Sequence, residues 1–354
     1  MTVERQLEER RDVIAIGASA GGVEALRALV GGLPPDFPGA ILVVLHLPRD
    51  APSALSSILD RSGPLPAAIA VDGAPLRFGR IHVAPNDHHL LLLDGHIRLS
   101  HGPAENGHRP AIDPLFRSVA RAYGPRGVGV VLSGSRDDGA AGLGAIVARQ
   151  GTAVVQDPAD ALYPSMPRAA LVRAPTEHVA PAAKLGGLLA EITAMPLPPG
   201  QTPSADTLLD NEVAMSDLAP MTTDEFAPPA GFGCPTCGGS LFQIGDGLQQ
   251  RYRCRVGHGW SPESLLDEQA LALESALWIA LRALEEKSAL SRRMARSGEN
   301  RRASTGARFQ SIAADADAAG ATIRRLIDRL GSMPDSDTDT APPEDAEILP
   351  SDVR

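Results

Sequence analysis

The stretch that decides the fold is "VIAIGASAGGVEAL", residues 13–26. Its first four residues predict a buried strand, its glycines predict a sharp turn around Ser19, and the residues from Gly22 onward predict a helix. Such a turn suits either a bound phosphate or a raised nucleophile. The glycine spacing, G-x-x-x-G-G, matches neither a dinucleotide site nor a lysine-containing phosphate loop. It therefore favours Ser19 as a nucleophile, and the alternative is a serine that only caps the following helix.

The rest of the N-terminal half repeats the pattern of this stretch, because short aliphatic runs alternate with amphipathic segments. Several runs are apolar on both faces, which is typical of inner strands of a parallel sheet. The fold class is therefore α/β, with a mainly parallel, doubly wound sheet and helices on both faces. The segment 80–99 predicts a hairpin at Asp94-Gly95, a candidate antiparallel edge. We expect strands at 13–16, 40–45, 80–84, 89–93, 127–132 and 153–156, and helices at 22–31, 53–61, 112–123, 139–150 and 182–194.

Composition narrows the classes of function. The chain has 354 residues and a formal net charge of -10, which argues against a surface for nucleic acid or anionic lipid. No apolar run approaches the ~18 residues that a membrane-spanning helix needs. The first 13 residues are charged and carry no apolar signal segment, so we expect a cytoplasmic protein. The 3 cysteines do not suggest a disulfide framework.

Two further strand ends carry the partners that an activated serine needs. His46 directly follows the predicted strand 40–45, and "VVLSGSRDDGAAGL" (130–143) carries two aspartates after another strand. Ligands bind at the carboxyl edge of a parallel sheet, so we expect these strand ends to meet Ser19 there. A nucleophilic serine requires a neutral imidazole and a carboxylate that orients the imidazole. The alternatives are a loop histidine at the surface and an aspartate that only caps a helix.

Five blocks of the sequence together resemble one known family. The region from residue 12 to 194 is similar to the catalytic domain of the chemotaxis-type protein-glutamate methylesterases, the CheB family. The similarity is specific because the blocks occur together and in one order. The blocks are "IGASAGG", "LHLP", "NGHRPAIDPLFRSVA", "LSGSRDDGAAG" and "QDPADALYPSMPRAAL".

The resemblance implies a Ser-His-Asp mechanism in which Ser19 is the nucleophile, His46 the general base and Asp138 the orienting carboxylate. Asp138 is preferred to Asp137 because the following glycine, Gly139, fixes the alignment. The chain departs from the family in two places. Ala20 stands where threonine is common, and Ser135-Arg136-Asp137 stand where the family has methionine or a small, glycine-rich stretch. These departures bear on the oxyanion contacts and on the fit of the substrate.

The resemblance also implies the reaction and its surroundings. Methyl esters on glutamate side chains of chemoreceptor-type proteins would be hydrolysed in chemosensory signal transduction, and receptor glutamines would be deamidated. Catalysis would need no cofactor. Backbone N–H groups near Ala20 and Gly21 would hold the oxyanion, while His108, Arg109 and Asp113 would line the substrate groove or form a structural ion pair.

The sequence also bears on regulation and on two competing functions. Only 12 residues precede the first strand, so we expect the family's receiver domain to be absent. One alternative function is a non-catalytic scaffold that binds receptor helices. Another is a serine hydrolase of a different ester or amide, because fold and triad do not fix the substrate.

A cysteine cluster follows the predicted α/β domain. The four residues Cys234, Cys237, Cys254 and His258 form two closely spaced pairs and include every cysteine of the chain. Three thiolates and one imidazole are a typical set for structural zinc, Zn²⁺, with no open position for catalysis. The alternative is a reduced thiol cluster without metal.

The domain organisation follows from these patterns. Ser261-Pro262 predicts the start of a helix, and an apolar 3-4 alternation from Phe309 to Leu330 predicts a second one. The two helices would form an antiparallel hairpin or an oligomeric coiled coil, and a signalling partner would dock on this C-terminal module. We expect an N-terminal tail (1–11), a catalytic domain (12–195), an acidic Pro-rich linker (196–230) with a candidate docking helix (208–215), a zinc ribbon (231–260), a helical hairpin (261–331) and a disordered acidic tail (332–354).

Overall fold

The computed structural model describes residues 10–48, 53–197, 206–219, 227–247, 250–298 and 303–331. The chain forms two compact units, one up to Ala270 and one from Leu271. Parts of the predicted linker and the whole predicted tail 332–354 lie outside the described residues.

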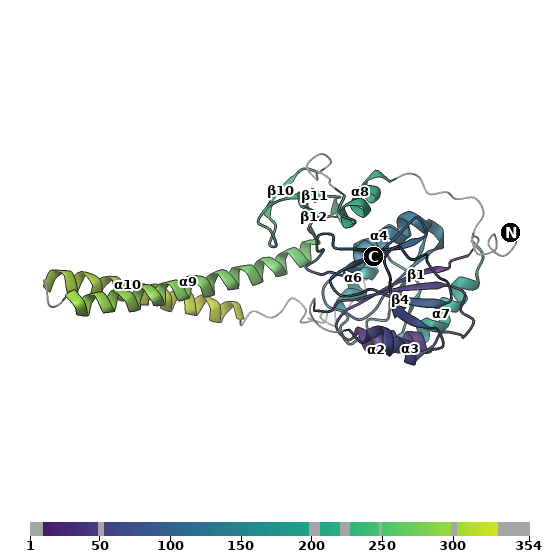
Figure 1. The fold of residues 1–354 in the computed structure, drawn as a ribbon, viewed down its shortest axis with the longest axis horizontal. Helices are drawn as coiled ribbons and strands as arrows, with labels where there is room; N and C mark the ends of the chain where they lie inside the picture. The colour runs from purple at the N-terminus through teal and green to yellow at the C-terminus, as the bar shows by residue number, and fades with distance from the viewer. Residues whose placement is uncertain are drawn as a thin grey trace, which may run out of the picture. The chain divides into compact units, whose positions relative to one another are not determined.

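The first unit is built on a seven-stranded sheet in which every pair of neighbouring strands is parallel (Figure 1). The central strand, β1, is buried along its whole length, as is β2. Strands apolar on both faces need cover on both sides, which explains why helices flank this sheet. The predicted α/β class is thus confirmed. The order of strands is β3 (Ala67–Ile69), β4 (Arg80–Val83), β2 (Ala40–Leu45), β1 (Val13–Ala18), β7 (Gly127–Val131), β8 (Thr152–Gln156) and β9 (Val179–Ala180).

Two hydrophobic cores lie on the two faces of the sheet. Successive residues of β1 point to opposite faces, so Ile14 enters one core while Val13 enters the other. The first core contains side chains from α2 (Gly22–Gly31), α3 (Leu55–Ser62) and α7 (Ala182–Ala194). The second contains side chains from α4 (Ile112–Tyr123), α5 (Ala140–Ala148), α6 (Ser165–Arg173) and α8 (Thr207–Ser216). Helix α8 lies within the predicted linker and includes the candidate docking helix.

The predicted hairpin at Asp94-Gly95 forms, but it does not extend the main sheet. Strands β5 (His89–Leu93) and β6 (His96–Ser100) make a separate two-stranded antiparallel sheet. Leu90 and Leu92 join the core that also contains side chains of α4, and the N–H of Leu92 donates to Ser118 Oγ of that helix at 3.0 Å. The prediction of an antiparallel edge was wrong because this hairpin packs on a helix and not along a strand.

The first unit also contains a small antiparallel sheet with the order β10-β11-β12-β13. The strands are β10 (Pro229–Gly233), β11 (Ser240–Ile244), β12 (Arg251–Cys254) and β13 (Gly259–Trp260). We call residues 227–260 the ribbon. Helix α9 (Pro262–Gly298) follows at once, and the N–H of Ser264 donates to Ser261 Oγ at 3.0 Å, as expected of a capping serine.

The described part of the second unit consists of the remainder of α9 and of α10 (Ala303–Gly331). The two helices run antiparallel, since Glu285 pairs with Arg324 while the later Arg292 pairs with the earlier Asp317. Small and aliphatic residues such as Leu281 and Ala316 are buried between them. Of the two predicted arrangements, the chain adopts the hairpin. Throughout the described part of the chain, we find no helix with the length and apolarity needed to cross a membrane.

Candidate active site

The turn after β1 places Ser19 at the carboxyl edge of the sheet. Gly21 adopts a left-handed conformation, with φ of 69°, and ends the turn as the N-cap of α2. A Cβ at this position would lie 2.8 Å from Ser133 Oγ, so the turn requires glycine for space as well as for its backbone angle. The N–H of Ser19 donates to the carbonyl oxygen of Ser133 at 2.9 Å, which fixes the turn against the end of β7. Ser19 itself stays partly exposed.

Three side chains from three strand ends meet in series. His46 Nδ1 lies 3.1 Å from Ser19 Oγ, and His46 Nε2 lies 2.8 Å from Asp138 Oδ2. The carboxylate is an acceptor, so Nε2 carries the ring proton and Nδ1 is left free to accept the hydroxyl proton. The structure thus brings together Ser19, His46 and Asp138, and Asp137 lies outside this series.

Asp138 is buried and collects donors from α4 in addition to His46. The N–H of Ile112 donates to Oδ2 at 2.7 Å and the N–H of Asp113 donates to Oδ1 at 3.3 Å. These are the first N–H groups of α4, where the helix dipole favours negative charge. Burial alone would raise the pKa of Asp138, but the hydrogen bond and charge of His46 and the bond from Ile112 hold this pKa below its usual range. The carboxylate therefore remains ionised beside the imidazole.

His108 lies flat against His46. The ring centroids are 3.7 Å apart and the planes differ by 7°. Burial, with a smaller contribution from the charge of His46, lowers the pKa of His108 to about 3. His108 is therefore neutral at neutral pH, and the stack fixes the plane of the His46 ring without adding a positive charge. The sequence predicted His108 as a residue of the substrate groove, and the structure shows that its ring stacks on His46.

The other predicted groove residue, Arg109, is occupied elsewhere. Its guanidinium pairs with Asp87 at 2.8 Å and donates to the carbonyl oxygens of His101 and Gly102. These contacts support the structural ion pair that the sequence left as the alternative. Asp113 is buried, and its Oδ1 accepts from the N–H of Gly142 at 2.6 Å, so it joins α4 to α5.

The turn beside Ser19 supplies two unused donors. Among the described residues, the backbone N–H groups of Ala20 and Gly21 donate to no protein oxygen. The carbonyl of Ala20 accepts from Ser133 Oγ at 2.8 Å, which holds the peptide in place. The exposed side chain of Leu162 lies close to Gly21, where a Cβ on that glycine would come within 2.9 Å of it. Ser133 and Leu162 were not identified from the sequence, because they contact the turn only in the fold.

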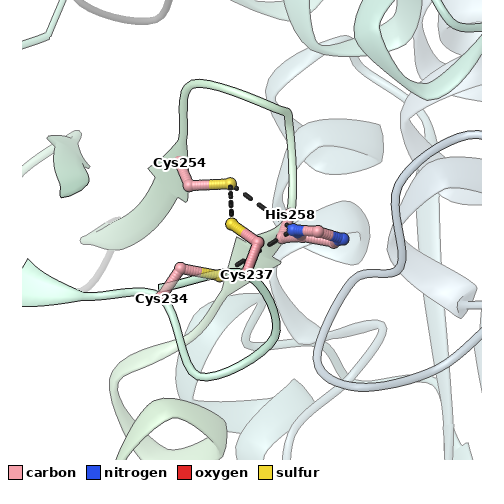
Figure 2. A group of neighbouring side chains, drawn as sticks. All are labelled: Cys234, Cys237, Cys254 and His258. Atoms are coloured by element: carbon pink, nitrogen blue, oxygen red, sulfur yellow. Dashed lines mark hydrogen bonds between the residues drawn. The ribbon is translucent and has the colours of Figure 1, made fainter. Parts of the chain in front are cut away.

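The second candidate site is the cysteine cluster of the ribbon (Figure 2). Cys237 Sγ and Cys254 Sγ are 3.8 Å apart, and His258 Nδ1 lies 3.8 Å from Cys234 Sγ and 3.5 Å from Cys254 Sγ. Tetrahedral zinc with Zn–S bonds of about 2.3 Å and Zn–N bonds of about 2.0 Å separates its ligand atoms by about 3.5 to 3.8 Å. The observed separations fit that geometry.

The backbone around the cluster also suits a metal ion. All four ligand atoms lie within 4.8 Å of one another. The N–H of Gly238 donates to the carbonyl of Cys234 at 2.8 Å, and the N–H of Gly257 donates to the carbonyl of Cys254 at 2.9 Å, so each pair sits on a tight turn. Hydrogen bonds from Cys254 and His258 lower the pKa of the Cys234 thiol, which favours the thiolate that a metal binds. These residues could hold a metal ion.

The geometry around Ser19 has the form of a serine hydrolase site, in which a strand-end serine, an imidazole and a buried carboxylate are hydrogen-bonded in order. Residues 14–189 match the family described as CheB methylesterase. This domain of the chain belongs to the CheB methylesterase family, so the resemblance found in the sequence is confirmed.

Several curated proteins are similar to this domain. A "Protein-glutamate methylesterase/protein-glutamine glutaminase 2" of Anaeromyxobacter dehalogenans is 41% identical over 53% of this chain and 58% of its own length. A protein of the same name from Methanosarcina mazei is 35% identical over 53% of each chain. The chain thus spans about half the length of the curated relatives it matches. The solved CheB methylesterase catalytic domain of Thermotoga maritima aligns with a TM-score of 0.49 and 30% identity, over 51% of this chain and 97% of its own.

Proposed function

We propose that this protein is a protein-glutamate methylesterase that demethylates chemoreceptor-type proteins and also deamidates their glutamines. The observation that carries the proposal is the hydrogen-bonded series from Ser19 through His46 to Asp138. The family of the domain and the names of its relatives support the choice of substrate. A cytoplasmic location agrees with this role, and a reducing compartment would keep the three thiols available for metal.

The proposed reaction has two steps. Ser19 Oγ attacks the ester carbonyl, and its proton passes to His46 Nδ1. The C–O bond to the methoxy group then breaks, and methanol leaves with the proton from His46. In the second step water, deprotonated by His46, attacks the glutamyl ester and releases glutamate and Ser19. Ammonia replaces methanol when the substrate is glutamine.

Charge on the intermediates is offset by two groups. The ionised Asp138 stabilises the imidazolium that forms when His46 takes the proton. The N–H groups of Ala20 and Gly21, at the N-terminal end of α2, would donate to the oxyanion. Because these are backbone donors, the replacement of the family's threonine by Ala20 leaves them in place.

Methanol release tests the proposal directly. The protein, Ser19→Ala and the control Ser57→Ala are incubated with methylated chemoreceptor, and methanol is measured. Ser57 is an exposed serine of α3, far from the turn in sequence. We expect release from the parent and from Ser57→Ala, and a loss of about 10³-fold or more in Ser19→Ala. Absence of release by the parent contradicts the esterase, and equal release by Ser19→Ala contradicts the nucleophile.

For the ribbon, we propose that Cys234, Cys237, Cys254 and His258 hold one structural Zn²⁺. Four protein ligands leave no position for water or substrate, so the ion would stabilise the fold of the ribbon and take no part in ester hydrolysis. The helical hairpin of the second unit is a candidate surface for a signalling partner or for a second copy of the chain.

A further inference from the structure

A tight turn on the catalytic domain lies between the triad and the ribbon. Glu105 and His108 exchange backbone hydrogen bonds, N–H to carbonyl, at 3.1 and 2.8 Å. Asn106 and Gly107 between them have φ of 51° and 80°, which is the two-residue turn that Asn-Gly favours. The turn directs three side chains to three places: Glu105 to the ribbon, Asn106 to Asp138, and His108 to His46.

Asn106 connects the ribbon to the catalytic carboxylate. Its Nδ2 donates to Asp138 Oδ1 at 3.0 Å, while its Oδ1 accepts from the backbone N–H of Ser261 at 2.8 Å. Its own N–H donates to the carbonyl of Gly259 in β13 at 2.8 Å. The side chain is only 3% exposed, so water does not replace these partners.

The oxygen of an amide group accepts hydrogen bonds and its NH₂ group donates them, so the contact with Ser261 determines which way the Asn106 amide faces. With the N–H of Ser261 on the oxygen side, the NH₂ group must face Asp138. Rotation of the amide by half a turn would place its oxygen against the carboxylate and its NH₂ against another N–H. Ser261 therefore selects the orientation in which Asn106 supports Asp138.

The segment before Asp138 is also held by the start of α9. Asp137 accepts from Ser261 Oγ at 2.7 Å and from Ser264 Oγ at 3.1 Å. Arg136 pairs with Asp267 at 3.2 Å. Arg136 and Asp137 are two of the residues at which the sequence departs from the family pattern. In this chain they contact the segment that follows the ribbon.

A buried charge cluster anchors the ribbon to the catalytic domain. Arg253 of β12 donates to Glu105 at 3.0 Å and to Glu212 of α8 at 3.3 Å. Arg117 of α4 also pairs with Glu105, and Arg251 pairs with Glu212. Removal of one partner from such a cluster leaves a buried charge without compensation, which is strongly destabilising. Arg253 is adjacent to the metal-ligand candidate Cys254, so the anchor and the cysteine cluster lie on one strand.

From these contacts we infer that Asn106 is a positioning residue through which the docked ribbon holds Asp138, so that the triad reaches full activity only while the ribbon is docked. The inference rests on the proposed Ser-His-Asp function. In this inference the docked ribbon increases the activity of the esterase. It does not inhibit the esterase by covering Ser19.

The first test changes Asn106 alone. Asn106→Gly keeps the turn, since glycine adopts positive φ without strain, but it removes both side-chain bonds. Asn106→Asp keeps an acceptor for Ser261 and removes the donor to Asp138. The control is Asn211→Ala, at a partly buried position of α8. The readout is labelling of Ser19 by an alkyl fluorophosphonate, in which Oγ bonds to phosphorus, fluoride leaves and His46 takes the proton.

We expect both Asn106 variants to lower the maximal labelling rate about tenfold to a hundredfold, because one hydrogen bond to a charged group is lost. The reagent concentration at half-maximal rate should stay within about twofold, since Asn106 does not touch the reagent. If the role of Asn106 were only structural, the variants would lose thermal stability, but the maximal labelling rate would not fall selectively while the half-maximal reagent concentration stayed constant. Unchanged labelling rates in both variants would overturn the inference.

The second test changes the anchor. Arg253→Met removes the central cation, and the emission of Trp260 reports whether the ribbon stays docked. Trp260 is buried at 2% exposure, and Trp278 is replaced by Phe throughout so that only Trp260 emits. We expect a red shift together with the labelling defect of Asn106→Gly. The double variant Asn106→Gly/Arg253→Met should be no slower than either single variant, because both changes break one connection.

The outcomes separate this inference from the proposed function. A red shift with unchanged or faster labelling would overturn the inference, and so would fully additive defects in the double variant. If Arg253→Met does not fold, the Asn106 variants still decide. If the parent labels at Ser19 but releases no methanol from methylated receptor, the methylesterase proposal fails while the positioning role of Asn106 stands.

Discussion

At the scale of single residues, Asp138 has two roles that depend on each other. It orients His46, and it also accepts the first two N–H groups of α4 in place of a capping side chain from that helix. A helix N-terminus stabilises a nearby carboxylate. The contact that caps the N-terminus of α4 therefore also keeps Asp138 ionised. Asp138 is thereby held against the N-terminus of α4, whose apolar side chains form part of the second core.

The carboxyl group of Asp113, close to Asp138, makes the stability of the fold depend on pH. Burial and the charge of Asp138 raise the pKa of Asp113 to about 7, above its value of about 3.9 in an unfolded chain. A group whose pKa is raised on folding contributes stability that is complete below its unfolded pKa and is lost as pH rises through its folded pKa. Ionisation of Asp113 should therefore contribute a progressive loss of stability between about pH 4 and pH 7. The lowered pKa values of the buried His89 and His108 oppose this contribution, because they add stability as pH rises over part of the same range.

Asp113→Asn tests this expectation because asparagine keeps the acceptor for Gly142 and cannot ionise. Unfolding temperatures are measured at several pH values for the parent, for Asp113→Asn and for Asp94→Asn, a control in an exposed turn. We expect the unfolding temperature of Asp113→Asn to rise relative to that of the parent as the pH is raised from about 4 to 7, and we expect no such relative change in Asp94→Asn. Identical pH profiles for the parent and Asp113→Asn would contradict the assignment.

At the scale of elements, the turn at Ser19 depends on close contact between three loops. Ser133, after β7, holds the Ala20 carbonyl on one side and accepts from the N–H of Tyr163 at 3.0 Å on the other. Gly134 follows it, with no room for a side chain between Met166 and Ser19. Small residues at these positions let the ends of β1 and β7 approach closely at the point where ligands bind.

Gly134→Ala should therefore damage the site. The added Cβ would lie 2.8 Å from the Cβ of Ser19 and would clash with Met166. We expect a fall of at least about tenfold in the labelling of Ser19 and a loss of about 1 to 3 kcal/mol of stability. The matched change, Gly187→Ala in α7, meets open space and should raise stability by about 0.5 to 1 kcal/mol. Equal labelling in the two variants would contradict this prediction, because it would show that the site accommodates a side chain at position 134.

The sequence predicted most of these elements because their signals are local. The buried strands and the helices of the sheet carry their own periodicity, and the glycine turn and strand-end residues mark the site. The sequence missed the helix α6 and the short edge strands β3 and β9. It also missed features that depend on contacts between distant segments. The β5-β6 hairpin was predicted, but its packing on α4 was not. The role of Asn106 was not predicted either, because its hydrogen bond from Ser261 joins residues far apart in the sequence. Arg109 likewise found its partner, Asp87, through the fold.

At the scale of the whole molecule, the first unit joins the catalytic domain and the ribbon, and the second unit is a helical hairpin. The ribbon has a small core of its own that includes Leu241, Trp260 and two cysteines. A core of this size needs further support, and a metal ion would supply it. The ribbon should therefore depend on metal more than the catalytic sheet does.

Metal analysis tests this dependence. Purified protein should contain about one zinc per chain, and His258→Ala should lower the content, because it removes one of four ligands. His96→Ala, at an exposed position of β6, serves as the control and should keep the metal. Removal of zinc with a chelator should shift the Trp260 emission of the Trp278→Phe protein to the red. Metal-free protein with unchanged emission would contradict a structural ion.

The two units also differ in how their ion pairs meet the solvent. The carboxylates of Glu105 and Glu212 and the guanidiniums of Arg117 and Arg253 are buried, whereas the pairs Arg292 to Asp317 and Arg324 to Glu285 along the hairpin are exposed. Dissolved ions weaken exposed pairs within a Debye length of about 8 Å at physiological ionic strength, and they weaken buried pairs much less. A rise in salt concentration would therefore weaken the exposed ion pairs of the hairpin more than the buried pairs that hold the ribbon on the catalytic domain.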